Sequence, residues 1–163
     1  MSDSRRQGDG GAATLDRMRI HALPADVVDH ARETTDEHHE HRAEAPGMPL
    51  RCCLTRAAEG VPVVLFGYSP TAGRGPYEEV GPVFVHAEAC GGPERTDVLP
   101  DALRVSPRVL RAYDAEGRIR SGELAAPDEL DVAVEKLLAD DETVEVQVRS
   151  LSHGCFLFAV TRD

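Results

Sequence analysis

The chain has 163 residues, of which 29 are acidic and 18 are basic, giving a formal net charge of −11. Because phosphate binding draws its affinity from clustered lysine and arginine, this balance argues against DNA or RNA as a partner. No apolar stretch approaches the roughly 20 residues of a membrane-spanning helix, and the polar N-terminus lacks a signal-peptide pattern, so we expect a soluble, cytoplasmic protein without a membrane partner.

Residues 1–13 are polar and Gly-rich, which predicts a disordered tail before a single domain at residues 14–163. Residues 19–23 favour a first strand, and Pro24 opens a short helix that we expect to end near residue 32. Residues 35–48 are too polar for a core, which indicates an exposed helix extension or a loop. A solvated face is favoured there over loose metal binding by its histidines, which are His38, His39 and His41.

Residues 51–56, 61–69 and 83–87 are predicted strands, because β-branched residues are enriched between Gly and Pro breaks. The Gly-rich segment at residues 73–76 lacks the Gly-Lys-Ser/Thr ending of a phosphate-binding loop. It is typical of a hairpin loop.

The C-terminal half predicts a hairpin at residues 108–124, a helix at residues 128–139 and a terminal hairpin at residues 143–161. The helix carries an apolar stripe at spacings of three and four that must pack on a sheet, formed by Leu130, Ala133, Val134, Leu137 and Leu138. Valines alternate with polar residues over 143–149, which predicts a strand with one solvent-exposed face. Consecutive strands with few helices favour an α+β fold, with a mainly antiparallel mixed sheet and two or three helices packed on it.

Several short motifs resemble a known family. They are Tyr77, Gly81-Pro82-Val83-Phe84-Val85-His86, Leu110-Arg111-Ala112-Tyr113-Asp114, and Gly154-Cys155-Phe156 with Arg162. In combination they resemble the family catalogued as domain of unknown function 1203 (DUF1203) over residues 17–162. That family often has Pro-Cys-Arg where this chain has Pro49-Leu50-Arg51, so leucine replaces a cysteine there. The resemblance implies a fold unit and residues to examine, Arg51 among them, but no activity.

Four cysteines are too few for a disulfide scaffold, and thiols are the default state in a reducing compartment. Cys52 and Cys53 are adjacent, with Cα atoms too close for a disulfide. On the predicted strand they would point to opposite faces, so we do not expect them to share one ion. At least one should be a buried small hydrophobe.

Histidine and cysteine occur together at two further places, where His86 precedes Cys90 by four residues and His153 precedes Cys155 by two. Together they could supply nitrogen and sulfur ligands for zinc, but the spacing matches no zinc motif and no metal site is predicted. A cysteine enzyme would need Cys155 within reach of His86 or His153.

Arg111 and Tyr113 lie two apart on one predicted strand and therefore share a face. That face could hold a carboxylate or phosphate, although pairing of Arg111 with an acidic neighbour inside the protein is favoured. The candidate ligand-binding residues are thus Arg51, His86, Arg111, Tyr113 and Cys155. We expect a binding or interaction module for a small molecule or a protein. The alternative is a metal-binding or thiol-dependent enzyme built around His86, Cys155 and Arg111. Cofactor and oligomeric state are not determined by the sequence.

Overall fold

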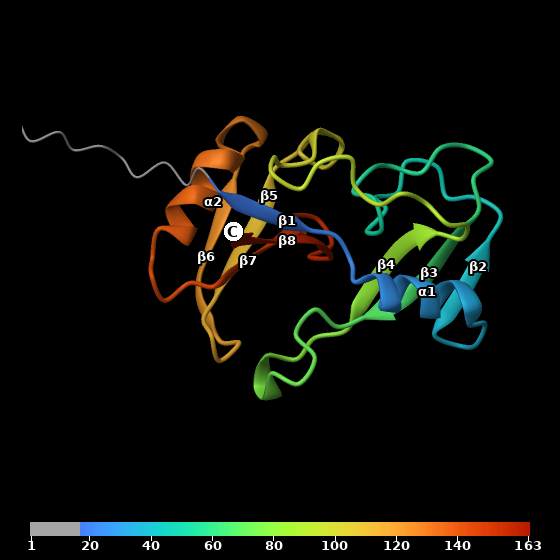
Figure 1. Ribbon diagram of the computed structural model, residues 1–163, viewed down its shortest axis with the longest axis horizontal. Helices are drawn as coiled ribbons and strands as arrows, with labels where there is room; N and C mark the ends of the chain where they lie inside the picture. The colour runs from blue at the N-terminus through green and yellow to red at the C-terminus, as the bar shows by residue number, and fades with distance from the viewer. Residues whose placement is uncertain (1–16) are drawn as a thin grey trace, which may run out of the picture.

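The computed structural model describes residues 17–163, so the predicted tail at residues 1–13 lies outside the described residues. Among the described residues, eight strands form two antiparallel sheets (Figure 1). One has the order β1 (Met18–His21), β8 (Phe156–Arg162), β7 (Glu145–Ser150), β5 (Arg108–Tyr113) and β6 (Ile119–Ala125). The other has the order β2 (His39–Arg42), β3 (Val63–Tyr68) and β4 (Gly81–His86). With the helices α1 (Ala25–Glu33) and α2 (Leu130–Leu138), this confirms the predicted α+β class.

Both hairpins predicted in the C-terminal half are present. β5 pairs with β6, and β7 pairs with β8 in antiparallel register. β1 adds to the far side of β8, so the first and last strands of the described chain are neighbours. Three 3-10 turns complete the elements of residues 17–163, at Gly75–Tyr77, Asp101–Leu103 and Pro127–Glu129. No helix in the described part of the chain is long and apolar enough to cross a membrane.

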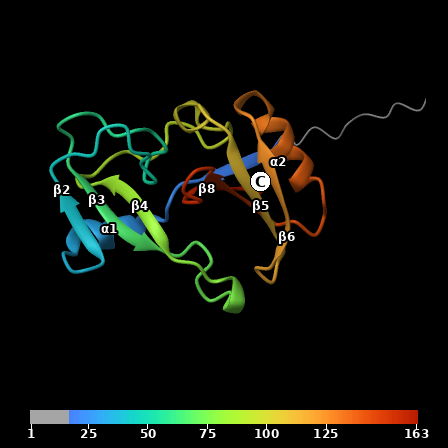
Figure 2. The same cartoon turned by 180° about the vertical axis from the view of Figure 1, so that it is seen from behind.

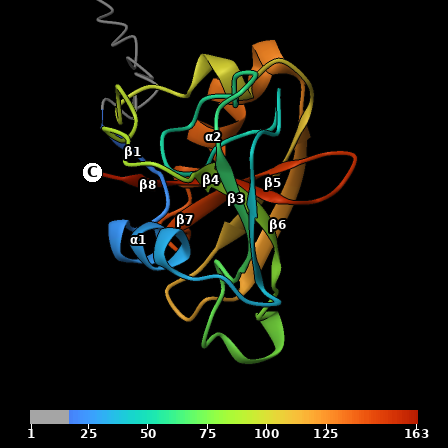
Figure 3. The same cartoon turned by 90° about the vertical axis from the view of Figure 1, so that its right-hand side faces the viewer.

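Each sheet carries one of the helices, and each has its own hydrophobic core. Helix α2 packs on the five-stranded sheet, with four stripe residues buried and Leu137 partly buried. Helix α1 covers the three-stranded sheet. Figure 2 shows the chain passing from the half that contains α2 to the half that contains α1, and Figure 3 views the molecule from the side of the three-stranded sheet. β8 contributes to both cores, since Leu157 and Phe158 pack in the first while Phe156 and Ala159 pack in the second.

The prediction of a strand at residues 51–56 is wrong. Residues 51–53 form a tight turn, in which the amide of Leu54 donates to the carbonyl of Leu50 (2.9 Å). Leu54 has φ of 60°, which is unfavourable for a leucine, and its side chain is almost fully buried. Residues 35–48 also differ from expectation, because they contain the short strand β2 on the edge of the smaller sheet.

The expected solvent-exposed face of residues 143–149 is also wrong, since Gln147 and Arg149 are buried. The segment before β4 covers this face with Glu79, whose carboxylate lies 3.6 Å from Arg149 and 2.6 Å from Arg111. Gln147 accepts a hydrogen bond from Arg149 (2.7 Å). Glu79, from a distant segment, therefore covers a strand face that the alternating pattern assigns to solvent.

Candidate functional site

The turn at residues 51–53 belongs to two neighbouring groups of side chains, one around a hollow lined by arginines and one containing cysteines and a histidine. It is attached to β4, because the amide of Arg51 donates to the carbonyl of Phe84 (2.9 Å). On one side Arg51 reaches a hollow beside β8, while Cys52 and Cys53 point toward His86 at the end of β4. A strand would separate successive side chains onto opposite faces, whereas this turn directs both thiols to one place.

The hollow has a volume of about 340 Å³, at the lower end for sites that bind small molecules. Its apolar wall comes from Met48, Pro49, Pro82, Phe84 and Leu157. Its polar wall comes from Arg51, Arg56, Ser106, Arg108, Ser150, His153 and Cys155. No carboxylate from the described residues lines it, although the chain has 29 acidic residues.

Arg51 is 3% exposed and is held by the backbone. Its Nε donates to the carbonyl of Phe156 (2.8 Å), and its Nη1 donates to the carbonyl of Pro49 (2.6 Å). Burial lowers the pKa of Arg51 to about 10, while the neighbouring Cys155 acts in the opposite direction. The guanidinium is thus fixed in orientation by neutral acceptors.

Arg56 and Arg108 are anchored in the same way. The Nε of Arg56 donates to Ala102 (2.9 Å) and its Nη1 to Gly47 (2.8 Å), in both cases to the carbonyl oxygen. The Nε of Arg108 donates to the carbonyl of Leu103 (2.7 Å), and its Nη1 to the hydroxyl of Ser106 (2.8 Å). Burial, and then repulsion from Arg56, lower the pKa of Arg108.

The three arginines share two further properties within residues 17–163. Their Nη2 atoms make no hydrogen bond, and no carboxylate lies within ion-pair distance of them. Arg51 and Arg108 are buried, whereas Arg56 is exposed at the rim. Buried charges are normally paired, so two buried cations and one exposed cation around one hollow favour an anion there.

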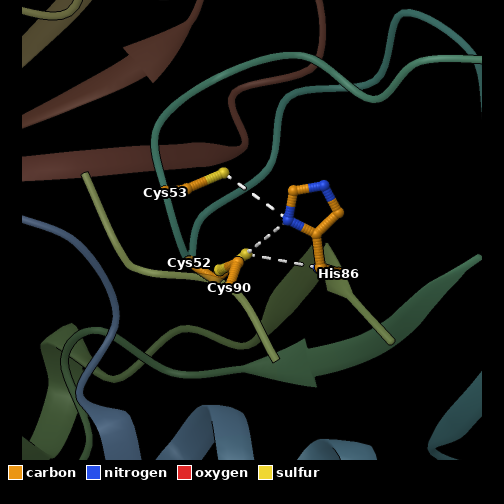
Figure 4. A group of neighbouring side chains, drawn as sticks. All are labelled: Cys52, Cys53, His86 and Cys90. Atoms are coloured by element: carbon orange, nitrogen blue, oxygen red, sulfur yellow. Dashed lines mark hydrogen bonds between the residues drawn. The ribbon is translucent and has the colours of Figure 1, made fainter. Parts of the chain in front are cut away.

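The second group consists of Cys52, Cys53, His86 and Cys90, which we call the Cys3His cluster (Figure 4). One ligand atom from each of the four lies within 4.8 Å of every other. The Nδ1 of His86 is 3.6 Å from the sulfur of Cys52 and 3.7 Å from that of Cys53. The expectation that Cys52 and Cys53 point to opposite faces is therefore wrong.

Each sulfur of the cluster has one further polar neighbour. The backbone amide of His86 donates to Cys52 (3.2 Å), and the guanidinium of Arg32 donates to Cys90 (3.6 Å). The hydroxyl of Thr55 lies 3.0 Å from Cys53. Hydrogen bonding between the two adjacent thiols lowers the pKa of Cys53 and raises that of Cys52, so this pair ionises unequally. All four cysteines are unpaired in the structure.

The family model described as protein of unknown function (DUF1203) matches residues 47–162, which is most of the chain. The chain belongs to the DUF1203 family. No curated protein and no solved structure matches it. The turn near the beginning of the DUF1203 match carries Arg51 of the hollow together with Cys52 and Cys53 of the Cys3His cluster. The other two cluster residues, His86 and Cys90, lie further along the match.

The five candidate ligand-binding residues of this DUF1203 chain lie in different surroundings, and the site suggested around His86, Cys155 and Arg111 is not assembled. Arg51 and Cys155 both line the hollow, whereas His86 belongs to the Cys3His cluster. Arg111 is paired with Glu79. Tyr113 is fully buried, with the guanidinium of Arg74 over its ring at 5.2 Å. The four residues considered as zinc ligands do not come together. His86 and Cys90 lie with Cys52 and Cys53 instead of with His153 and Cys155.

Arg56 and Arg108 were missed by the sequence analysis. All but one of the 18 basic residues are arginine, so no single arginine stands out by type. The sequence pattern also placed Cys52 and Cys53 on a strand, where their side chains would point in opposite directions and not both toward His86. The nearest available signal was the pair itself, since adjacent cysteines on a turn can both face one point.

Proposed function

We propose that this protein binds a small molecule that carries a carboxylate or phosphate next to an apolar group. The observation that supports the proposal is the hollow of about 340 Å³ with three arginines and no carboxylate among its described lining residues. Arginine presents a planar fork of donors that matches both anions. The apolar wall opposite would contact the rest of the ligand.

The negative charge of the whole chain does not oppose this proposal. At physiological ionic strength, charges separated by more than about 8 Å in water are largely screened. An anion in the hollow would contact Arg51, Arg56 and Arg108 directly, within hydrogen-bonding distance. The local positive charge therefore outweighs the distant acidic surface.

The arrangement around Cys155 favours binding over thiol catalysis. Its thiol lies 3.8 Å from the carbonyl of His153, and the ring of His153 bonds to the hydroxyl of Ser152 (3.0 Å). A catalytic thiol needs a general base, most often an imidazole, that takes its proton. In this structure the Cys155 thiol and the His153 ring do not pair with each other.

The proposal is tested by titrating the protein with benzoate and phenyl phosphate, using benzamide as the neutral comparison, and measuring binding by NMR chemical-shift changes. We expect both anions to bind at the hollow and benzamide to bind much more weakly. Removing one arginine fork deletes a charge-assisted hydrogen bond of about 1.5–3 kcal/mol. Arg56→Gln and Arg108→Gln should each therefore weaken anion binding by about 10- to 100-fold.

Arg118→Gln is the matched control, because Arg118 is exposed and its side chain makes no ion pair among the described residues. It should leave anion binding unchanged. Equal binding of benzamide and benzoate, or equal loss in Arg118→Gln and Arg108→Gln, would contradict the proposal.

A further inference from the structure

We propose that the Cys3His cluster binds one zinc ion, which fixes the turn at residues 51–53 to the end of β4 and to the loop that carries Cys90. Three thiolates and one imidazole form a common ligand set for tetrahedral structural zinc. The proposal concerns a second site, separate from the arginine hollow, and it does not depend on anion binding.

The distances in the cluster suit a tetrahedral ion. With zinc–sulfur bonds of about 2.3 Å and zinc–nitrogen bonds of about 2.0 Å, a sulfur and a nitrogen ligand lie about 3.5 Å apart. The Nδ1 of His86 lies 3.6 Å from the sulfur of Cys52 and 3.7 Å from the sulfur of Cys53. All four ligand atoms lie within 4.8 Å of one another, so only a small movement of Cys90 would bring its sulfur to bonding distance from the ion.

The surroundings of the cluster also suit zinc. Ligands of metal sites are usually held by a second layer of hydrogen bonds, and here each sulfur has its own polar partner: the His86 amide, the Thr55 hydroxyl and the Arg32 guanidinium. Arg32 also donates to the carbonyl of His86 (3.0 Å). Three thiolates and Zn²⁺ carry a net charge of −1, which the adjacent Arg32 would offset.

Access and chain geometry support the same assignment. A hollow of about 350 Å³ reaches Cys52 and Cys90 from the side of α1, giving an ion a path to the cluster. Leu54, directly after Cys53, has the unfavourable φ of 60°. Strained backbone persists where the surroundings hold it, and here it allows two successive cysteines to face one point.

The first test is the metal content of the full chain, purified without chelator and measured by native mass spectrometry and elemental analysis. We expect about one zinc per chain. After removal of zinc under reducing conditions, reloading with Co²⁺ should give the visible absorption of a tetrahedral ion together with sulfur-to-cobalt charge transfer. A protein that takes up neither ion stoichiometrically would overturn the proposal.

The variants separate the cluster from the remaining cysteine. Cys53→Ser and Cys90→Ser should each lower zinc affinity by about 100-fold or more, and Arg32→Ala by about 10-fold. Cys155→Ser is the matched control, since Cys155 lines the arginine hollow and is not part of the cluster. Retention of full zinc affinity by Cys53→Ser, or its loss in Cys155→Ser, would overturn the assignment.

A measurement on the unmodified chain tests the same assignment even if the variants fail to fold. Alkylation of the native protein followed by mass mapping reports the reactivity of each thiol with and without zinc. Zinc should protect Cys52, Cys53 and Cys90 and leave Cys155 reactive. If Cys52, Cys53 and Cys90 each react at the same rate with and without zinc, the cluster does not hold the ion.

Discussion

Leu130→Ala is expected to lower the free energy of unfolding by about 2–5 kcal/mol, because it leaves a cavity in the core under α2. Leu130 is fully buried at the start of the helix and packs in the core of the five-stranded sheet. Against a total stability of about 5–15 kcal/mol for a domain, this is a large fraction. Urea unfolding followed by circular dichroism measures the change.

Leu124→Ala is the control for this substitution. It deletes the same atoms, but Leu124 is 59% exposed on β6, so we expect a change within about 0.5 kcal/mol. Leu137, the position that the sequence pattern also placed in the stripe, is only partly buried. Leu137→Ala should therefore cost less than Leu130→Ala. Similar losses for Leu124 and Leu130 would show that α2 does not support the sheet as described.

Glu79→Gln is expected to destabilise the protein by about 1–3 kcal/mol, because it removes the carboxylate that faces two arginines. Arg149 is 4% exposed, and its Nε has no hydrogen-bond partner among the described residues. Without the charge of Glu79, Arg149 would stay buried beside Arg111 with no anion. The carboxylate is 44% exposed, so solvent screens part of the interaction and the expected loss is below that of a fully buried pair.

Glu59→Gln provides the same chemical change at an exposed position with no ion pair among the described residues, and it should leave stability unchanged. The measurement is again urea unfolding, at low and high salt. If the Glu79→Gln and Glu59→Gln variants unfold at the same urea concentration, Glu79 does not compensate the buried arginine.

Local patterns predicted the main helix and every strand except β2, although they also predicted a strand at residues 51–56 that the structure does not have. The stripe from Leu130 to Leu138 and the alternating valines near Val146 are periodic, and periodicity depends only on which side of one element is buried. The antiparallel pairing of β7 with β8 followed from the short connection between them. These features are decided by neighbours in sequence, so the sequence alone was sufficient for them.

The sites depended on contacts between distant segments. The sequence predicted that Cys52 and Cys53 would not form a disulfide with each other, but it wrongly placed residues 51–56 on a strand. Docking of Arg51 on Phe84 selects the turn, and this brings His86 and Cys90 beside the two thiols. The same docking places Arg51 next to the strand that begins at Phe156.

By itself, the amino-acid sequence determined the α+β class, the C-terminal hairpins, the buried stripe of α2 and the family resemblance. Only the tertiary structure decided which arginines share a hollow, which cysteines converge and why Gln147 and Arg149 are buried. The physical reason is that hydrophobic periodicity reports the burial of one face of one element. Partners of charged and sulfur-containing side chains are set by long-range packing, and such packing leaves no regular spacing in the sequence.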